Sequence, residues 1–445
     1  MDGWGDRVGL QCDVLVIGGG PAGSTAAAML AEDGRKVVLL EKDIHPRFHI
    51  GESLLPANMP LLKRLGVLDE IAAIGMPKWG VEFISPHHSH TTTLRFTDAW
   101  DKSLAGAYQV RRSAFDHLLL RNAARKGALV HEGHRVRQVA FRPEFGGADV
   151  QSVGPQGAVQ EWDARLVVDA SGRETFLGNK FRIKEKNPRH SSAAVYGHFV
   201  DAERNAGSRE GDISIYWFEH GWFWFIPLAD GTTSVGAVCW PYYLKTRRKP
   251  VADFLLDTIA LCPRLAGRLQ RASRVGDVHA TGNYSYSCST AHGAATRASC
   301  LMAGDAFAFI DPVFSSGVFL AMSSAFMAAD AARVCLGTPG RSAQAMRDYE
   351  RSIRKGPEAF AWFIERMTQP VIRDLFMTPG NPLRAREAVM SILAGDIYRG
   401  TPYGPSLLAF KSYYYMNLMK NPLSAIRNWR GRKQKIEDSL LVADA

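Results

Sequence analysis

Residues 13–23 read DVLVIGGGPAG, and this stretch decides the fold. An apolar run, residues 13–17, leads into a glycine cluster, and an alanine-rich helix is predicted from Pro21 to about residue 33. A second apolar run, residues 36–40, ends on Glu41. Strand, glycine turn, helix and strand in this order predict a βαβ unit.

The glycines of this unit fit the G-x-G-x-x-G pattern in the setting that the pattern requires. Gly18 permits the tight turn, Gly20 lets the backbone approach a pyrophosphate, and Gly23 lets the helix pack closely on the strand. Glu41 lies 23 positions after Gly18, where a carboxylate can accept ribose hydroxyls. The pattern predicts a dinucleotide site, and its alternative is a glycine turn with a structural role only.

Two later segments favour FAD over NAD. Residues 301–306, LMAGDA, again predict a strand, a turn and a helix start, so that Asp305 can bind the ribityl chain of a flavin. Residues 167–173, VVDASGR, form a third segment that is expected to converge on the same cofactor.

Composition limits the broad class of the protein. The 445 residues are 46% hydrophobic and 22% charged, which is typical of a globular protein of two or three packed units and excludes a disordered or collagen-like chain. The six cysteines are scattered without a C-x-x-C pair, as expected for buried thiols in a reducing compartment. The apolar stretch 301–332 is interrupted by Asp305, Asp311 and Asp330, so we predict no membrane span and a cytoplasmic location.

Charge is concentrated at the end of the chain. Of the net charge of +10, residues 341–445 contribute 17 Lys and Arg against 10 Asp and Glu. This basic region predicts an acidic partner or membrane surface or, alternatively, a solvated helical tail, and no nucleic-acid module is visible. The histidine-rich residues 87–90 have no acid or cysteine nearby and predict a solvated turn, so no metal site is expected.

Together these motifs resemble the two-domain flavoprotein monooxygenases, the group that contains para-hydroxybenzoate hydroxylase, over residues 11–335. The resemblance implies an α/β fold in which a glutathione-reductase-like FAD-binding Rossmann domain is interleaved with a mixed or antiparallel substrate-side sheet. We expect the FAD segments at about 11–80, 105–190 and 275–335, the substrate-side sheet at about 81–104 and 191–274, and a basic helical region at 341–445. The implied cofactor-binding residues are Gly18, Gly20, Ala22, Gly23, Glu41, Lys42, Arg47, Glu52, Ser53, Arg112, Asp169, Gly304, Asp305, Pro312, Gly317 and Val318.

Residues 221–227, GWFWFIP, set this chain apart from a generic monooxygenase. Trp222 and Trp224 lie two positions apart on a predicted strand and therefore point to one face. The run resembles the W-x-W-x-I-P signature of flavin-dependent halogenases. That resemblance implies a wall of Trp222, Trp224, Ile226 and Pro227 that keeps the organic substrate away from the flavin, and the alternative is an aromatic stripe of the core.

Lys78, in residues 76–80 (MPKWG), stands among apolar neighbours and away from any charge run. If buried, it would have a lowered pKa and could act as a nucleophile or hydrogen-bond donor. In the halogenases that this chain resembles, the matching lysine receives hypohalous acid made at the flavin, either as a haloamine or as a hydrogen-bonded adduct. The resemblance therefore implies that Lys78 is the catalytic residue that delivers the halogen.

Two further segments resemble halogenase signatures. Residues 309–317, FIDPVFSSG, fit F-x-x-P-x-x-S-x-G and precede a predicted helix, so the backbone N–H groups of Ser316 and Gly317 could bind chloride or bromide. The alternative is an ordinary helix cap. Residues 49–56, HIGESLLP, resemble the segment that lies along the flavin.

One departure bears on the substrate. Tryptophan halogenases carry a glutamate just before the S-S-G element, where this chain has Phe314. The chain instead resembles the phenol- and pyrrole-halogenating branch, several of whose members act on carrier-protein-tethered substrates. An electron-rich phenol or pyrrole needs less help in attacking an electrophile, and the general base is left unassigned.

The sequence thus predicts an FADH2-dependent halogenase that makes hypohalous acid from flavin hydroperoxide, formed with O2, and chloride or bromide. Its expected partners are a separate NAD(P)H-dependent flavin reductase and a small phenolic or pyrrolic substrate of secondary metabolism, free or on an acyl or peptidyl carrier protein. The alternatives are a single-component FAD and NAD(P)H aromatic hydroxylase, a geranylgeranyl-reductase-like enzyme and a non-catalytic binding protein.

Overall fold

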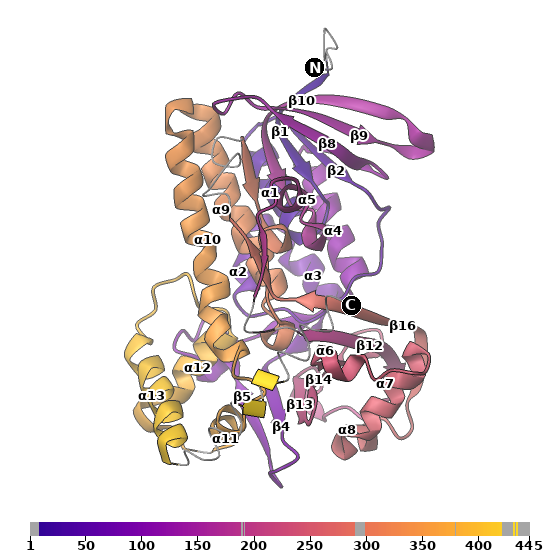
Figure 1. The fold of residues 1–445 in the computed structure, drawn as a ribbon, viewed down its shortest axis with the longest axis vertical. Helices are drawn as coiled ribbons and strands as arrows, with labels where there is room; N and C mark the ends of the chain where they lie inside the picture. Colours follow the sequence, from indigo (N-terminus) through magenta and orange to yellow (C-terminus); the bar gives the residue numbers. More distant parts are fainter. Residues whose placement is uncertain are drawn as a thin grey trace.

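The computed structural model describes residues 9–187, 190, 192–289, 299–378, 380–420, 430–431 and 433–434. Figure 1 shows two halves stacked along the long axis, each built around its own sheet. Helix α10 (Ser342–Ile364) runs down one side of the molecule from the upper half toward the lower. The α/β architecture predicted from the sequence is confirmed.

The upper half is the cofactor-side sheet. In the described part of the chain its order is β7-β2-β1-β10-β9-β8, with β18 beside β10. Strands β1, β2, β7, β10 and β18 are parallel, and β8 and β9 return antiparallel. The strands are β1 (Leu10–Ile17), β2 (Val37–Glu41), β7 (Leu129–Glu132), β8 (Arg135–Phe141), β9 (Ala148–Val153), β10 (Val159–Asp169) and β18 (Cys300–Met302).

Helices cover the parallel strands of this sheet, which explains why those strands are nearly continuous apolar runs. The long apolar helix α9 (Gly317–Gly337) packs against α1 (Pro21–Glu32) and α10. Among the described residues α9 is the one helix long and apolar enough to cross a membrane, but most of that stretch is buried inside the protein. The other helices of this half are α2 (Asn58–Leu65), α3 (Leu68–Ile74), α4 (Arg112–Arg125) and α5 (Phe176–Lys180).

The lower half contains the sheet that we predicted on the substrate side, with the order β16-β12-β15-β14-β13-β4-β5 among the described residues. All neighbouring pairs are antiparallel except β13 with β4. One face is covered by α7 and α8, and the other faces the upper half and the C-terminal helices. The elements are β4 (Gly80–Ile84), β5 (Thr91–Arg95), β12 (Ser192–Val200), β13 (Ile213–Phe218), β14 (Gly221–Pro227), β15 (Thr233–Cys239), β16 (Ser273–Tyr284), α6 (Pro241–Leu244), α7 (Val251–Ala260) and α8 (Pro263–Arg268).

The C-terminal region is helical where the structure describes it. After α10 come α11 (Pro370–Met377), α12 (Ala385–Leu393) and α13 (Gly404–Lys420), which Figure 1 shows gathered at the lower end beside β4 and β5. Aromatic packing fixes them there: the ring centroids of Phe83 and Phe376 are 4.8 Å apart, and Trp217 Nε1 donates to Met367 O at 2.8 Å. Most of the predicted basic tail beyond residue 420 lies outside the described residues.

Several predicted boundaries differ from those observed. The apolar spacing of residues 60–73 predicts one helix, but the structure has two, α2 and α3, because Gly66 adopts a left-handed conformation, with φ of 77°, at the C-cap of α2. The sequence likewise predicts one helix over about 251–271, but the structure has two, α7 and α8, which are divided before Pro263 because a proline cannot continue a helical hydrogen-bond ladder. Strand β16 extends the substrate-side sheet into residues expected on the cofactor side.

Small sheets join the two halves. Strand β3 (Met76–Lys78) pairs antiparallel with β6 (Ala107–Gln109), and Ser53 forms a bridge to Gln109. A second small sheet contains β11 (Lys184–Lys186), β17 (Tyr286–Cys288) and β19 (Ala308–Phe309). The first of these connections brings residues 52–54 next to Lys78.

Candidate cofactor and active site

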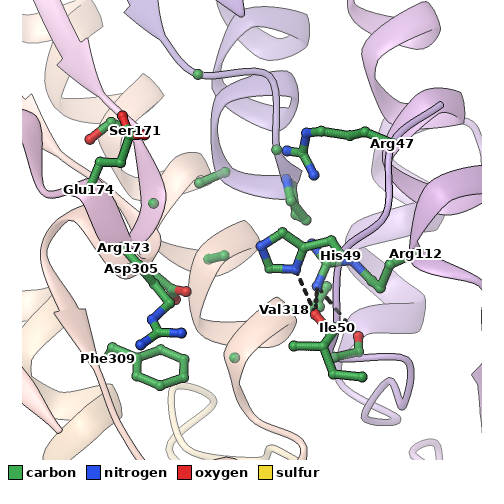
Figure 2. Close-up of a pocket in the computed structure, with 18 of the residues that line it drawn as sticks. Arg47, His49, Ile50, Arg112, Ser171, Arg173, Glu174, Asp305, Phe309 and Val318 are labelled. Atoms are coloured by element: carbon green, nitrogen blue, oxygen red, sulfur yellow. Dashed lines mark hydrogen bonds between the residues drawn. The ribbon is translucent and has the colours of Figure 1, made fainter. Parts of the chain in front are cut away.

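A cavity of about 570 Å³ lies beyond the carboxyl ends of the parallel strands, between the two halves of the molecule. This is the position in which open α/β sheets bind their ligands. Figure 2 shows Arg47, His49 and Arg112 on one side of it, with Ser171, Arg173 and Asp305 opposite. The predicted cofactor residues that line it are Gly18, Gly20, Ala22, Glu41, Lys42, Arg47, Glu52, Ser53, Arg112, Asp305, Pro312, Gly317 and Val318.

The glycine turn at the end of β1 is shaped by close backbone contacts. Gly18 has φ of 99°, and a Cβ on Gly23 would lie 1.8 Å from the Gly18 carbonyl oxygen. Only glycine therefore allows α1 to begin this close to β1. The Gly19 N–H donates to Glu41 Oε2 at 2.5 Å, which holds that carboxylate at the cavity edge.

Arg112 is fixed by a buried carboxylate that the sequence interpretation missed. Its Nε and Nη2 donate to the two oxygens of Asp116 at 2.8 and 3.0 Å, and its Nη1 donates to Ile50 O at 2.8 Å. Although burial acts to raise the pKa of Asp116, the charge and hydrogen bonds of Arg112 hold it below the usual value. The i,i+4 spacing of this pair on α4 was the available signal.

The opposite wall carries Asp305 and Arg173. Burial raises the pKa of Asp305 to about 6, against the attraction of Arg112 and Arg173. Asp169 does not line the cavity; its carboxylate accepts the N–H groups of Ser171 at 2.9 Å and Leu177 at 2.7 Å and so shapes the loop that does. Gly23 and Gly304 likewise lie behind the wall.

These groups fit a dinucleotide. Glu41 lines the cavity, where its carboxylate can accept hydrogen bonds from ribose hydroxyls. The start of α1 presents backbone N–H groups that can donate to phosphates. Asp305 supplies a partly buried acceptor on the facing wall.

The aromatic wall closes the lower side of the cavity. Trp222, Trp224 and Ile226 line it, whereas Pro227 does not. The two indole centroids are 6.1 Å apart on one face of β14, and Trp224 Nε1 donates to Ser234 Oγ at 3.1 Å. The intervening Phe223 and Phe225 pack on the opposite face, so the predicted alternation of β14 is confirmed.

The segment before α9 is held from behind by Asp311. Its Oδ2 is 3.0 Å from His190 Nε2 and accepts Ser192 Oγ at 2.5 Å, while Oδ1 accepts the Val313 N–H at 3.2 Å. Ser315 adopts a left-handed conformation, with φ of 56°, and turns the chain into α9.

The predicted halide residues lie at that turn. Gly317 lines the cavity, and Ser316 is fully buried beside it. The Ser316 hydroxyl has no hydrogen-bond partner among the described residues. A buried unpaired hydroxyl is costly and leaves a donor available for an anion.

Lys78 is buried just beyond the cavity. Its Nζ donates to Ser53 Oγ at 2.8 Å and to Leu54 O at 3.0 Å, and lies 5.2 Å from the Phe96 ring centroid. Burial lowers the pKa of Lys78 to about 7, against the attraction of the Asp212 carboxylate. Because Ser53 lines the cavity and Lys78 does not, the Ser53 side chain connects the cavity to the amine.

The histidines of residues 87–90 contact other groups of the protein. His88 is 3.0 Å from Ser85 Oγ, and His90 is 2.9 Å from Met377 O. Within the described ranges no group of three or more His, Cys, Asp or Glu side chains is arranged to hold a metal ion.

Comparison with known proteins identifies the cofactor. An FAD binding domain family matches residues 11–353. A flavin-dependent halogenase of Armillaria mellea is 37% identical over 73% of this chain and 67% of its own. The 1H-pyrrole-2-carbonyl-[peptidyl-carrier protein] chlorinase of Pseudomonas fluorescens is 30% identical over 87% of this chain and 90% of its own. The myxobacterial chondrochloren halogenase structure superposes with a TM-score of 0.74 at 33% identity, over 88% and 92% of the two chains.

Alanine substitutions at two glycines of the turn should affect stability and FAD binding differently. Gly23→Ala should lower the melting temperature of the apoprotein and release FAD, because its Cβ would collide with the Gly18 backbone. A Cβ on Gly20 would meet only the end of Arg47 at 3.8 Å, so Gly20→Ala should leave the apoprotein unchanged and weaken FAD binding by at least about tenfold. Calorimetry measures the melting temperatures and flavin titration measures the FAD affinities. A normal FAD affinity in Gly20→Ala would contradict the assignment of Gly20 to the pyrophosphate site.

Burial of Lys78 should also appear in the pH dependence of stability. The folded pKa is about 7 and the unfolded pKa about 10.4, so between these values the unfolded chain binds more protons and stability rises with pH. The free energy of unfolding of the wild type, relative to Lys78→Met, should therefore rise by roughly 4 kcal/mol over this window. Denaturant titrations at intervals of pH measure it, and a constant difference would mean that Lys78 is charged in the folded state.

Proposed function

The chain belongs to the flavin-dependent halogenases, and we propose that it transfers chlorine or bromine to an electron-rich phenol or pyrrole through Lys78. The observation that carries this proposal is the buried amine, which has a pKa of about 7 and is connected to the cofactor cavity through Ser53. When bound, reduced FAD supplies the chemistry that converts O2 and halide into hypohalous acid. We infer that a separate NAD(P)H-dependent flavin reductase provides the reduced FAD.

Different residues in and beside the cavity bind the cofactor, bind the halide and exclude the substrate. Glu41, Arg112 and Asp305 hold the dinucleotide, and Ser316 with Gly317 binds the halide at the start of α9, where the backbone N–H groups favour an anion. Trp222 and Trp224 occupy the side of the cavity toward the substrate and exclude an aromatic ring from the flavin. Such exclusion keeps a reactive species from the wrong acceptor.

Lys78 then accepts the halogen. The neutral amine attacks the halogen of hypohalous acid, an N–X bond forms, the X–O bond breaks, and water leaves with the amine proton. The aromatic ring next attacks this halogen, so that a C–X bond forms and the N–X bond breaks with its electron pair going to the nitrogen. The nitrogen takes up one proton as the ring loses one, which regenerates the neutral amine. A lysine with a pKa near 7 serves this step because a large fraction is neutral at physiological pH.

The substrate is proposed to be carried on a carrier protein. The similarity to the pyrrolyl-carrier-protein chlorinase extends over nearly the whole of that relative. The basic residues of the C-terminal region would favour encounter with an acidic protein. Carriage of the ring as a thioester also fits the absence of a carboxylate at Phe314, because nothing at that position would anchor a free amino acid.

Bromination of a simple phenol tests the function directly. The protein with FAD, an added flavin reductase, NADH, O2 and bromide should give a product with the bromine isotope doublet by mass spectrometry. Lys78→Ala should reduce this product by at least about 10²-fold while FAD binding is retained, since the amine does not line the cofactor cavity. NADH oxidation without added reductase, with a product heavier by one oxygen, would favour the hydroxylase alternative instead.

The pH profile distinguishes the two possible roles of Lys78. If the neutral amine takes the halogen, the brominated product per O2 consumed should rise about tenfold between pH 6 and pH 8, as the fraction of neutral amine follows a pKa of about 7. Lys78→Ala at each pH provides the background from free hypohalous acid. A yield that falls with pH would instead assign a hydrogen-bonding role to the ammonium form.

A further inference from the structure

Helix α13 presents an uncharged face to solvent. Its buried side chains, Ser406, Phe410 and Tyr414, are spaced four residues apart and face the protein. Ahead of the terminal Lys420, the exposed positions of the helix are Gly404, Pro405, Leu408, Ser412, Tyr415, Met416 and Met419. We call these seven residues the α13 face. None of them is charged, whereas the outward face of a surface helix is normally charged or polar.

The α13 face gathers large apolar side chains. Leu408, Tyr415 and Met419 are spaced i, i+7 and i+11, which places them in one line along the helix. Leu408 is 67% exposed and Met419 is 71% exposed. Four of the thirteen large apolar side chains that are exposed among the described residues belong to this one helix, which Figure 1 shows at the outer edge of the lower end. Such a cluster indicates an interaction surface.

Amphipathic side chains border this face. Trp362 of α10 donates through Nε1 to the Tyr415 hydroxyl at 3.4 Å, and Lys411 Nζ lies 5.2 Å from the Trp362 ring centroid. Tryptophan, tyrosine and a lysine whose apolar stem runs along a ring are side chains typical of the boundary between a membrane and water. These three residues and the α13 face lie apart from the residues that line the cofactor cavity.

The chain around α13 is strongly basic. The forty residues 397–436 contain no Asp or Glu and have eight cations: Arg399, Lys411, Lys420, Arg427, Arg430, Arg432, Lys433 and Lys435. Carboxylates on the neighbouring segments are paired with arginines, as in Asp101 with Arg399, Glu365 with Arg366, Asp374 with Arg373 and Glu387 with Arg384. Glu358 of α10 is exposed one helical turn before Trp362 and offsets a small part of the charge. A net positive charge therefore remains beside the α13 face.

We propose that the α13 face binds the surface of an anionic lipid membrane. Leu408, Tyr415 and Met419 enter the boundary between headgroups and acyl chains, and the surrounding cations contact the lipid phosphates. The helix lies along the surface, where its 17 residues extend roughly 25 Å. Apolar insertion combined with a basic patch provides the two contributions that stable attachment to a membrane surface needs. This inference is independent of the proposed function.

Charge and apolar surface together favour lipid over other partners. A second copy of this chain would bring two basic surfaces together, and their like charges would repel. An acidic protein would match the cations, but its carboxylates would lose water against Leu408 and Met419 without gaining a charged partner from the α13 face. Anionic lipid offers phosphates to the cations and an apolar layer to the leucine and methionine side chains.

Sedimentation with vesicles tests the proposal directly. The full-length protein loaded with FAD is mixed with vesicles of phosphatidylcholine alone or of phosphatidylcholine and phosphatidylglycerol in equal amounts. It should bind the anionic vesicles at least about tenfold more tightly than the neutral ones, and high salt should reduce this difference. Absence of binding to the anionic vesicles, or equal binding to both compositions, would overturn the proposal. Binding to soluble polyglutamate without binding to vesicles would assign the surface to an acidic protein and would overturn it too.

Two double variants separate the apolar contribution from the charge. Leu408→Gln with Met419→Gln keeps every charge and uses a good helix former, and it should weaken binding to anionic vesicles at least about tenfold. Lys420→Gln with Arg430→Gln, at two exposed positions, should weaken it by a similar factor. The matched control is Leu256→Gln, because Leu256 is 48% exposed on α7, across the lower half from α13. Melting temperatures check the fold, and wild-type binding by the first variant, or equal loss in the control, would contradict the α13 face as the binding surface.

Methionine oxidation shows whether the face is free in solution. Dilute hydrogen peroxide should oxidise Met416 and Met419 in the vesicle-free protein, because both side chains are exposed, and anionic vesicles should slow this oxidation at least about tenfold. Peptide mass spectrometry measures the two sulfoxides. Protection without vesicles would mean that another part of the chain or a second copy already covers the face, and would overturn the proposal.

Bromination of a soluble phenol separates this inference from the proposed function. Leu408→Gln with Met419→Gln should brominate the phenol as the wild type does, because neither residue lines the cofactor cavity. A protein that brominates the phenol but does not bind anionic vesicles overturns the membrane surface alone. A protein that binds the vesicles through the α13 face but brominates nothing overturns the proposed function alone.

Discussion

The Lys78 amine lies in the protein core, where it is hydrogen-bonded to two neutral oxygens and has no carboxylate in hydrogen-bond contact among the described residues. This desolvation lowers its pKa to about 7 and costs folding free energy that a methionine would not. The surrounding backbone holds the amine in place through the pairing of β3 with β6 and the Val110 N–H bond to Glu52 O at 2.7 Å. Ser53 is thereby fixed between the amine and the cofactor cavity. A buried amine whose pKa is lowered at a cost in folding free energy is typical of a reacting group.

The rest of the architecture gives the two sides of that amine different surroundings. On the cofactor side, charge is organised by the Arg112–Asp116 pair and by Asp305, and the Trp222 and Trp224 rings limit what can pass. On the other side, the C-terminal helices cover the same sheet with aromatic side chains, among them Phe376 packed on Phe83. This arrangement fits the proposed function, in which a small oxidant and a large ring meet at the Lys78 nitrogen while the ring stays away from the flavin.

Much of the fold and of the candidate site could be predicted from local sequence patterns. The glycine turn, the alternation of β14 and the isolation of Lys78 each depend on residues close in sequence, and each lies where the pattern placed it. Other features depend on distant partners. The link from Lys78 to Ser53 spans 25 residues and arises from strand pairing, and the position of Asp169 behind the cavity follows from its bonds to a loop after β10. The helix breaks at Gly66 and Pro263 come from single residues that end or begin a helix, which hydrophobic periodicity alone does not resolve.

The surroundings of Phe314 support the proposal that the substrate is an activated ring. Its ring lies 6.3 Å from that of Phe360 and 6.0 Å from that of Phe363, within the core that anchors the C-terminal helices. A carboxylate at that position would be buried among aromatic rings, where its charge is strongly disfavoured. The same packing that secures these helices thus removes the acid that could orient a substrate or take its proton. The proposed phenol or pyrrole would compensate, because its own oxygen or nitrogen stabilises the cation formed when the ring takes the halogen, and the proton could then leave without a dedicated carboxylate.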